Sequence, residues 1–165
     1  MGANTILPKE LVEKANVMAD EARNSISKYC CEECHAYCCR KGYLVLKKEE
    51  VDVVTQGRRE ELIEKKILKD LGKNYSLFMG NYEQPCPSLD EKFMCKVHKS
   101  EFRSKVCGDF PLFIEGDLVR LSIRCPAVKE NLLFPFVKQL QILGFKIVKP
   151  DAFGALELYN VKLVN

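Results

Sequence analysis

The sequence predicts an α+β fold: a single small, cysteine-rich, metal-stapled domain with an N-terminal helix, short strands that include a hairpin, and a C-terminal helix. Three observations support this class. The chain has 165 residues, 47% hydrophobic and 30% charged, which suits one compact domain with an apolar core. Apolar residues recur at helical spacing near the N-terminus and alternate with polar ones around a later Gly-Asp turn. Nine cysteines could supply the ligands of a metal staple.

The N-terminal helix is expected at about residues 8–28. Pro8 stands near its first turn, and apolar residues recur at helical spacing at Leu11, Ala15, Met18, Ala22 and Ile26. Beyond the first cysteines, the hydrophobic pattern predicts a strand and two helices, at residues 43–46, 48–56 and 60–71. Glycines interrupt and end these helices. Residues 73–87 have no clear period, so they predict a loop with room for one strand.

The second half of the chain predicts a hairpin, a helix and two more strands. The Gly116-Asp117 turn lies between two apolar segments, at residues 113–115 and 118–123. The last helix is expected at about 129–143 with Pro135 inside it, followed by strands at 145–148 and 156–164. We expect residues 1–165 to form one domain, with a metal-binding core at about 30–126 and a helix and strand extension at about 127–165.

Composition and charge narrow the range of functions and compartments that we expect for this protein. The net charge is only +3, and no basic block with interleaved aromatics indicates a nucleic-acid surface. Charged Lys9 and Glu10 come too early for a secretory signal, and no apolar run reaches the roughly 20 residues of a membrane span. We therefore expect a cytoplasmic protein with no membrane partner. Because the cytosol keeps thiols reduced, nine cysteines there indicate metal binding rather than disulfides.

The metal-binding signal is concentrated in Cys31-Glu-Glu-Cys34-His-Ala-Tyr-Cys38-Cys39. A CxxC turn can set two thiolates on one ion, and a third cysteine shortly after can join them. Adjacent Cys38 and Cys39 diverge on a strand or a helix, so we expect them to serve two sites or one polynuclear cluster. The predicted metal ligands, in two sets of four, are Cys31, Cys34, Cys38, Cys39, Cys86, Cys95, Cys107 and Cys125.

Other residues near these cysteines receive lesser roles. Cys30 is interpreted as a buried small side chain. His35 and His98 could be ligands, but with enough thiols present we favour supporting or surface roles. Basic neighbours could offset the negative charge of metal-bound thiolates, and they are Arg40, Lys41, Lys96, Arg103, Lys105 and Arg124.

Two other readings of the first cluster are weaker. Cys31 to His35 matches the CxxCH pattern of haem c attachment, but haem leaves the neighbouring cysteines unexplained and normally needs an exported chain. A thioredoxin-like role for Cys31 and Cys34 needs a helix that follows a strand, whereas here a helix precedes the motif.

The cysteine pattern resembles the YkgJ-type, or CxxCxxCC, cysteine-cluster family, which is described as zinc- or iron-chelating. The resemblance covers about residues 31–126, including Cys86-Pro-Ser-Leu-Asp, Phe110-Pro111 and Cys125-Pro126. It places the family's eight cysteines on the same eight predicted ligands and leaves Cys30 as the extra. The sequence departs from the family pattern at His98, Ser104 and Gly108, and in the longer spacing between Cys34 and Cys38.

The metal and the activity stay open at the level of sequence. Two four-thiolate zinc sites would account for eight cysteines, but the crowded cluster with distant Cys-Pro pairs slightly favours an iron–sulfur cluster. Our first hypothesis is a non-catalytic metal-binding protein. The alternatives are a metal-cluster-dependent protein-modifying enzyme related to flagellin lysine N-methylase, and a metal carrier or sensor. No cofactor-binding glycine motif is found and no catalytic residue can be assigned, so whether the protein is an enzyme is uncertain.

Overall fold

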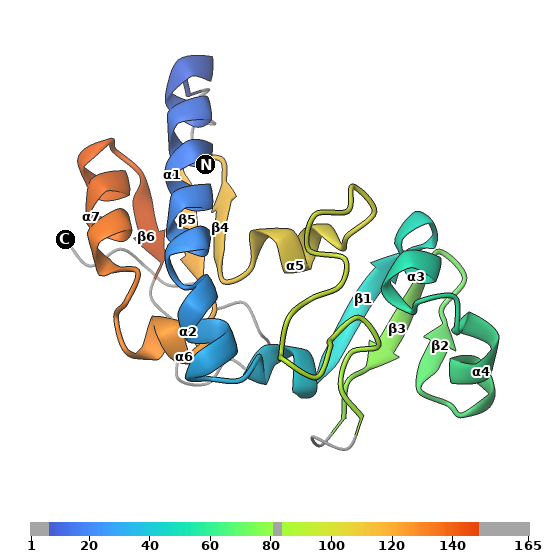
Figure 1. Ribbon diagram of the computed structural model, residues 1–165. Coiled ribbons are helices and arrows are strands. Elements are labelled where there is room, and N and C mark those ends of the chain that lie inside the picture. The colour runs from blue at the N-terminus through green and yellow to red at the C-terminus, as the bar shows by residue number, and fades with distance from the viewer. Residues whose placement is uncertain (1–6, 81–83, 149–165) are drawn as a thin grey trace. The chain divides into compact units, whose positions relative to one another are not determined.

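A computed structural model of the protein describes residues 7–80 and 84–148 and confirms the predicted α+β class (Figure 1). The chain divides into two compact units, one of Met1–Tyr29 with Asp109–Asn165 and the other of Cys30–Gly108. The second unit starts where the predicted cysteine core starts, whereas the predicted end of that core, residue 126, belongs to the first unit. That the whole chain forms one domain stays a prediction.

The 30–108 unit is built on a three-stranded antiparallel sheet of order β1-β3-β2. Its elements, with α5 reaching one residue beyond the unit, are η1 (Tyr37–Arg40), β1 (Tyr43–Lys47), α3 (Lys48–Val54), α4 (Arg59–Glu64), β2 (Leu68–Asp70), β3 (Asn74–Phe78) and α5 (Lys105–Asp109). Side chains alternate along β1, with Leu44 and Leu46 buried and Tyr43 and Val45 exposed. The buried face joins one apolar core with Val51 of α3 and Leu62 of α4.

The other unit combines helices with a second three-stranded sheet, β4-β5-β6, in which β5 pairs antiparallel with β4 and parallel with β6. Its elements are α1 (Lys9–Ser25), the first half of α2 (Ser27–Glu32), β4 (Leu112–Glu115), β5 (Leu118–Leu121), α6 (Pro126–Lys129), α7 (Phe134–Ile142) and β6 (Lys146–Val148). Helix α1 packs against β4 and α7 (Figure 1) through a fully buried row of small residues, Ala15, Ala19 and Ala22.

Several predicted elements are confirmed: the strand at 43–46, the helix that starts at Lys48, one strand within 73–87, the hairpin around Gly116-Asp117 and the strand within 145–148. The strand predicted at 156–164 lies outside the described residues. Among those residues, no helix has both the length and the apolar character needed to cross a membrane.

Three predicted helices are wrong in their extent. The first is interrupted at Ile26, which caps α1 before α2 starts. The helix expected at 60–71 ends at Glu64, because Lys66 has a left-handed backbone (φ 60°) and β2 then pairs with β3. The helix expected at 129–143 is two helices, α6 and α7, and Pro135 lies in the first turn of α7, where a missing N–H is tolerated.

Candidate functional site

The first cysteine cluster is folded around a tight reversal between α2 and η1. His35 and Ala36 both have left-handed backbones, with φ of 51°. The Ala36 N–H donates to the Cys30 carbonyl at 2.7 Å, which closes the reversal. The Cys34 thiol lies 3.5 Å from the same carbonyl oxygen. The reversal therefore folds Cys34 back onto the helix that carries Cys30 and Cys31.

Backbone hydrogen bonds bring the distant Cys86 to this first cluster. The Cys86 N–H donates to the carbonyl of Cys39, which lies in η1, at 2.8 Å. The loop after Cys86 is fixed on its other side, because the buried Ser88 hydroxyl donates to the Val54 carbonyl at the end of α3, at 2.5 Å. An isolated antiparallel β-bridge pairs Cys95 with Leu89 in the same segment. The chain segment 86–95 is therefore attached both to η1 and to the end of α3.

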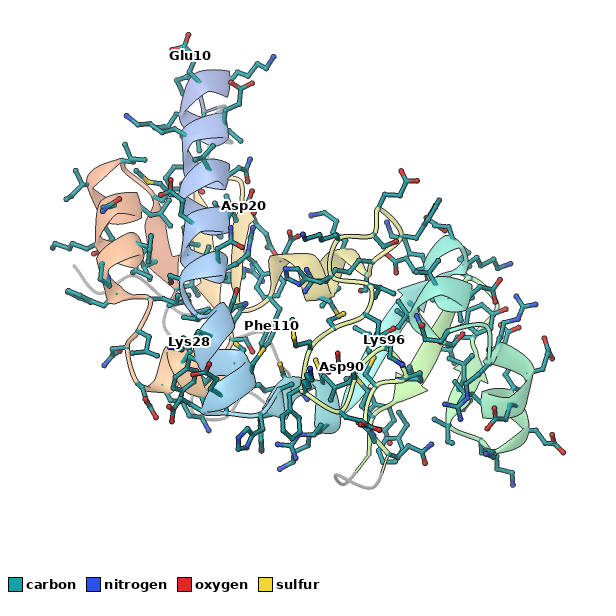
Figure 2. The ribbon with its side chains drawn as sticks, in the orientation of Figure 1. Glu10, Asp20, Lys28, Asp90, Lys96 and Phe110 are labelled. Atoms are coloured by element: carbon teal, nitrogen blue, oxygen red, sulfur yellow. The ribbon has the colours of Figure 1, made fainter. Side chains whose placement is uncertain are left out.

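A second contact to the first cluster comes from Phe93, which the sequence did not identify. The Cys31 thiol lies 3.6 Å from the Phe93 carbonyl oxygen. The Phe93 ring lies 4.8 Å from the His35 ring, and the Arg40 guanidinium lies 5.4 Å above it. The positive φ of Phe93, 61°, is uncommon for an aromatic residue and no sequence pattern indicates it. Asp90 (labelled in Figure 2) belongs to the same loop, and its charge, together with burial, raises the pKa of Cys31.

Cys107 reaches the site from α5. Together with Cys39, it packs against the apolar core to which the buried Cys86 belongs. The N-terminus of α5 is tied to that of α3 by Glu50, a buried carboxylate that accepts the N–H of Lys47 at 2.9 Å and that of Lys105 at 3.2 Å. Glu50 therefore helps to fix the position of α5 and of its cysteine.

The thiols interact electrostatically, and Cys39 affects the pKa of more of the other thiols than any other cysteine does. The hydrogen bond with the Cys38 thiol, burial and the charge of Cys38 raise the pKa of Cys39 well above its ordinary value. Burial raises the pKa of Cys86 and of Cys107 to about 12, and the charge of Cys39 adds to both shifts. Burial also raises the pKa of Cys95 and of Cys31, again with a contribution from Cys39. Ionised sulfurs repel one another, and a bound cation would reverse that effect.

Cys34 is the exception. A hydrogen bond from the Cys30 thiol lowers the pKa of Cys34 to about 6, supported by the backbone N–H groups of Tyr37 and Ala36 and by the charge of Arg40, against the opposing effect of burial. Cys30 was interpreted as a buried small side chain, but it is only half-buried and acts on its neighbour. Cys30 therefore influences the acidity of Cys34, although it lies outside the predicted ligand set.

Seven of the eight predicted ligands lie in the 30–108 unit, and Cys125, which is buried, lies in the other unit. All nine cysteines lie in the described residues and none is in a disulfide, and both His35 and His98 are exposed. Within 7–80 and 84–148, no group of three or more Cys, His, Asp or Glu side chains is placed so that it could hold a metal ion. The donor set has the soft thiol chemistry that zinc and iron–sulfur clusters require, but the sulfurs would have to converge further.

Fold and site together define a cysteine-rich α+β protein with a cluster of interacting free thiols. Comparison with protein-family models, with curated proteins and with solved structures found no match for the chain. The resemblance to the cysteine-cluster family therefore stays a prediction, carried by the cysteine pattern.

Proposed function

We propose that this protein binds a thiophilic metal through the cysteines of its 30–108 unit, as an iron–sulfur cluster or as zinc, with iron–sulfur favoured. The observation that carries the proposal is the hydrogen bond from the Cys86 N–H to the Cys39 carbonyl, 2.8 Å long, which joins the distant Cys-Pro segment to the Cys38-Cys39 pair. Such a joining of a crowded cysteine cluster with a distant Cys-Pro is what iron–sulfur ligation uses.

Two further features support the proposal. The first is that Cys39 raises the pKa of Cys31, Cys86, Cys95 and Cys107, so these thiols interact electrostatically. Metal binding would deprotonate these thiols, so their raised pKa values make the affinity rise with pH. Nine cysteines outside disulfides also suit a reducing compartment such as the cytoplasm. We propose a non-catalytic role, structural or electron-carrying, because no general acid–base pair is assigned.

The proposal is tested by anaerobic purification of the full chain, followed by an absorption spectrum and quantification of iron, zinc and sulfide per chain. Brown protein with matching iron and sulfide would identify an iron–sulfur protein. Colourless protein with about two zinc ions per chain would identify the two four-thiolate sites that eight cysteines allow. Protein that contains neither metal, and that takes up neither under reducing conditions, would contradict the proposal.

A pair of variants locates the site. Cys39→Ser should lose most of the bound metal, because Cys39 interacts with the largest number of other thiols. Cys30→Ser is the matched control, since Cys30 is in the same segment but outside the predicted ligand set, and it should keep the metal. Equal metal content in the two variants would assign the metal to other residues. Cys125→Ser tests in the same way whether the eighth predicted cysteine is a ligand.

A further inference from the structure

The β1-β3-β2 sheet has one face on the apolar core and one open face. Successive side chains of a strand point to opposite faces, and residues paired across strands share a face. Leu44, Leu46 and Leu77 belong to the inner face, because they join the core with side chains of α3 and α4. The alternate positions form the outer face, and they are Tyr43, Val45, Lys47, Lys69, Asn74, Ser76 and Phe78.

Two aromatic rings lie at one end of this outer face. Tyr43 and Phe78 are directly opposite each other in the β1–β3 register, and their ring centroids are 5.1 Å apart. Tyr43 is 60% exposed, and Val45, the next residue on the same face, is 52% exposed. The open face of an antiparallel sheet is ordinarily polar, and exposed apolar side chains grouped inside a polar rim mark interaction sites. The ring pair is therefore a candidate contact surface as well as a support of the sheet.

The rest of the outer face is polar and basic. Lys47 and Lys69 are exposed, and none of the seven residues of the face is acidic. Within residues 7–80 and 84–148, neither lysine takes part in an ion pair. Lys69 is paired with Ser76, two residues from Phe78, and Lys47 is four residues from Tyr43. At about 3.4 Å per residue, the lysines lie about 7 and 14 Å along the sheet from the rings.

We propose that the outer face binds single-stranded nucleic acid, with bases stacked on Tyr43 and Phe78 and phosphates beside Lys47 and Lys69. The partner is selected by charge and shape together, because this face offers flat rings and positive charge with no carboxylate. A single strand has unpaired bases that can stack on aromatic side chains and phosphates that attract lysines, and some RNA-binding sheets use an open face in this way. A protein partner fits less well, since protein–protein interfaces are depleted in lysine.

The linear sequence does not indicate this surface, because no basic run with interleaved aromatics exists. Its residues come from three strands between positions 43 and 78, and only the strand register places them on one face. The inference is independent of the proposed metal binding, since no thiol belongs to the outer face.

The rings are tested by titrating the full-length protein, as purified, into fluorescein-labelled oligo(dT) and oligo(U) of about 15 nucleotides and measuring anisotropy. Tyr43→Leu and Phe78→Leu keep an apolar side chain but lose the stacking surface, so each should weaken binding by about fivefold or more. Phe134→Leu is the matched control, because Phe134 is 61% exposed but belongs to the other unit, and it should bind like the wild type. The oligonucleotide that binds more tightly identifies DNA or RNA as the preferred ligand.

The lysines are tested through the salt dependence of binding. For single strands, log K falls with log salt concentration by about 0.7 for each phosphate that is neutralised. Replacing both lysines, Lys47→Gln with Lys69→Gln, should therefore reduce the slope by about 1.4. The control replaces two exposed lysines of the other unit, Lys129→Gln with Lys138→Gln, and should leave the slope unchanged. Because both pairs are exposed, these variants test the inference even if a ring variant fails to fold.

The results that would overturn the inference are distinct. One is no change in anisotropy with either oligonucleotide. Another is binding that the outer-face variants and the control variants weaken equally, or a duplex that binds as tightly as the single strand, since both indicate attraction by overall charge. Sedimentation velocity that shows a dimer, dissociated by Tyr43→Leu, would assign the face to a second copy of the chain. Melting temperatures measured in parallel separate weaker binding from loss of the fold, and the metal content of the same samples tests the proposed function separately.

Discussion

At the level of single residues, the thiols of the 30–108 unit differ widely in acidity because their surroundings differ. Cys34 lies in the reversal, where N–H groups and a neighbouring thiol can donate to its sulfur, and this lowers its pKa to about 6. Cys86 and Cys107 pack against apolar side chains, and burial raises the pKa of each to about 12. One unit therefore contains both an easily ionised thiol and thiols that stay protonated at neutral pH unless a cation binds.

This difference predicts selective alkylation of the chelated, reduced protein. Because Cys34 ionises above its pKa of about 6, its reaction with iodoacetamide should rise between about pH 5 and pH 7 and then level off. Cys86 and Cys107 should stay almost unreactive over that range, because burial keeps them as thiols. Peptide mass spectrometry measures the extent of alkylation at each cysteine as a function of pH.

Cys30→Ala provides the control for this experiment. It removes the hydrogen bond from the Cys30 thiol that lowers the pKa of Cys34, so the Cys34 profile should move to higher pH. Alkylation of Cys34 that follows the ordinary thiol profile already in the wild type would contradict the assigned environment.

At the level of elements, helix ends determine where the site's segments lie. Glu50 accepts N–H groups from both Lys47 and Lys105, so one carboxylate joins the start of α3 to the start of α5. Helix α4 ends at Glu64, and the chain then turns through Lys66 into β2. Neither Glu50 nor Lys66 is next to a cysteine in the sequence, yet Glu50 is bonded to the helix that carries Cys107 and the turn at Lys66 leads into the sheet of the same unit.

Replacing Glu50 should destabilise the protein. Glu50→Ala removes two charge-assisted hydrogen bonds from a buried site and should lower the free energy of unfolding by about 2–4 kcal/mol. Urea denaturation measures the change. Glu49→Ala removes a carboxylate from the same first turn, but an exposed one, and should change stability by less than about 1 kcal/mol. Equal effects of the two changes would contradict the bridging role of Glu50.

Lys66 should be replaceable by glycine with a gain in stability. Its φ of 60° is in the left-handed region and its side chain is exposed, so Lys66→Gly relieves about 1 kcal/mol of backbone strain without removing packing. Thermal unfolding should show a melting temperature a few degrees higher. Lys65→Gly, one residue earlier where φ is −76°, should give no gain. A loss of stability in Lys66→Gly would show that the turn does not have this conformation.

At the level of the whole molecule, seven predicted ligands belong to one compact unit. If they bind metal, its binding energy stabilises that unit in particular, and for structural zinc this energy is about 10–16 kcal/mol. Each unit also has its own sheet and its own buried side chains. Loss of metal should therefore affect the two units unequally.

Hydrogen exchange before and after chelation measures this inequality. Amide protection should fall most in the 30–108 unit, including β1 and β3, whose side chains form the core that Cys86 joins. Protection in β4 and β5 should change less. An equal loss of protection in both units would show that metal stabilises the chain as one cooperative domain, as the sequence predicted.

Some parts of this fold could be predicted from the sequence because their causes are local. The Gly116-Asp117 turn suits a tight hairpin, and Gly116 has the positive φ, 59°, that glycine allows. The strand at Tyr43 could be predicted because its side chains alternate between buried and exposed. The limits of α4 could not, because residues 68–70 have no local reason to leave a helix and become β2 only by pairing with β3.

By itself, the sequence determined the chemistry of the candidate site: which residues are thiols, how densely they are spaced, and that thiolates are ligands suited to soft metals. Tertiary structure decided which of them meet. The Cys39–Cys86 hydrogen bond, the Phe93 carbonyl beside Cys31 and the Arg103 guanidinium beside Cys107 join residues whose proximity depends on loops and turns. Spacing in a sequence reports local geometry only, whereas such contacts exist because the apolar core of the 30–108 unit fixes the positions of its loops.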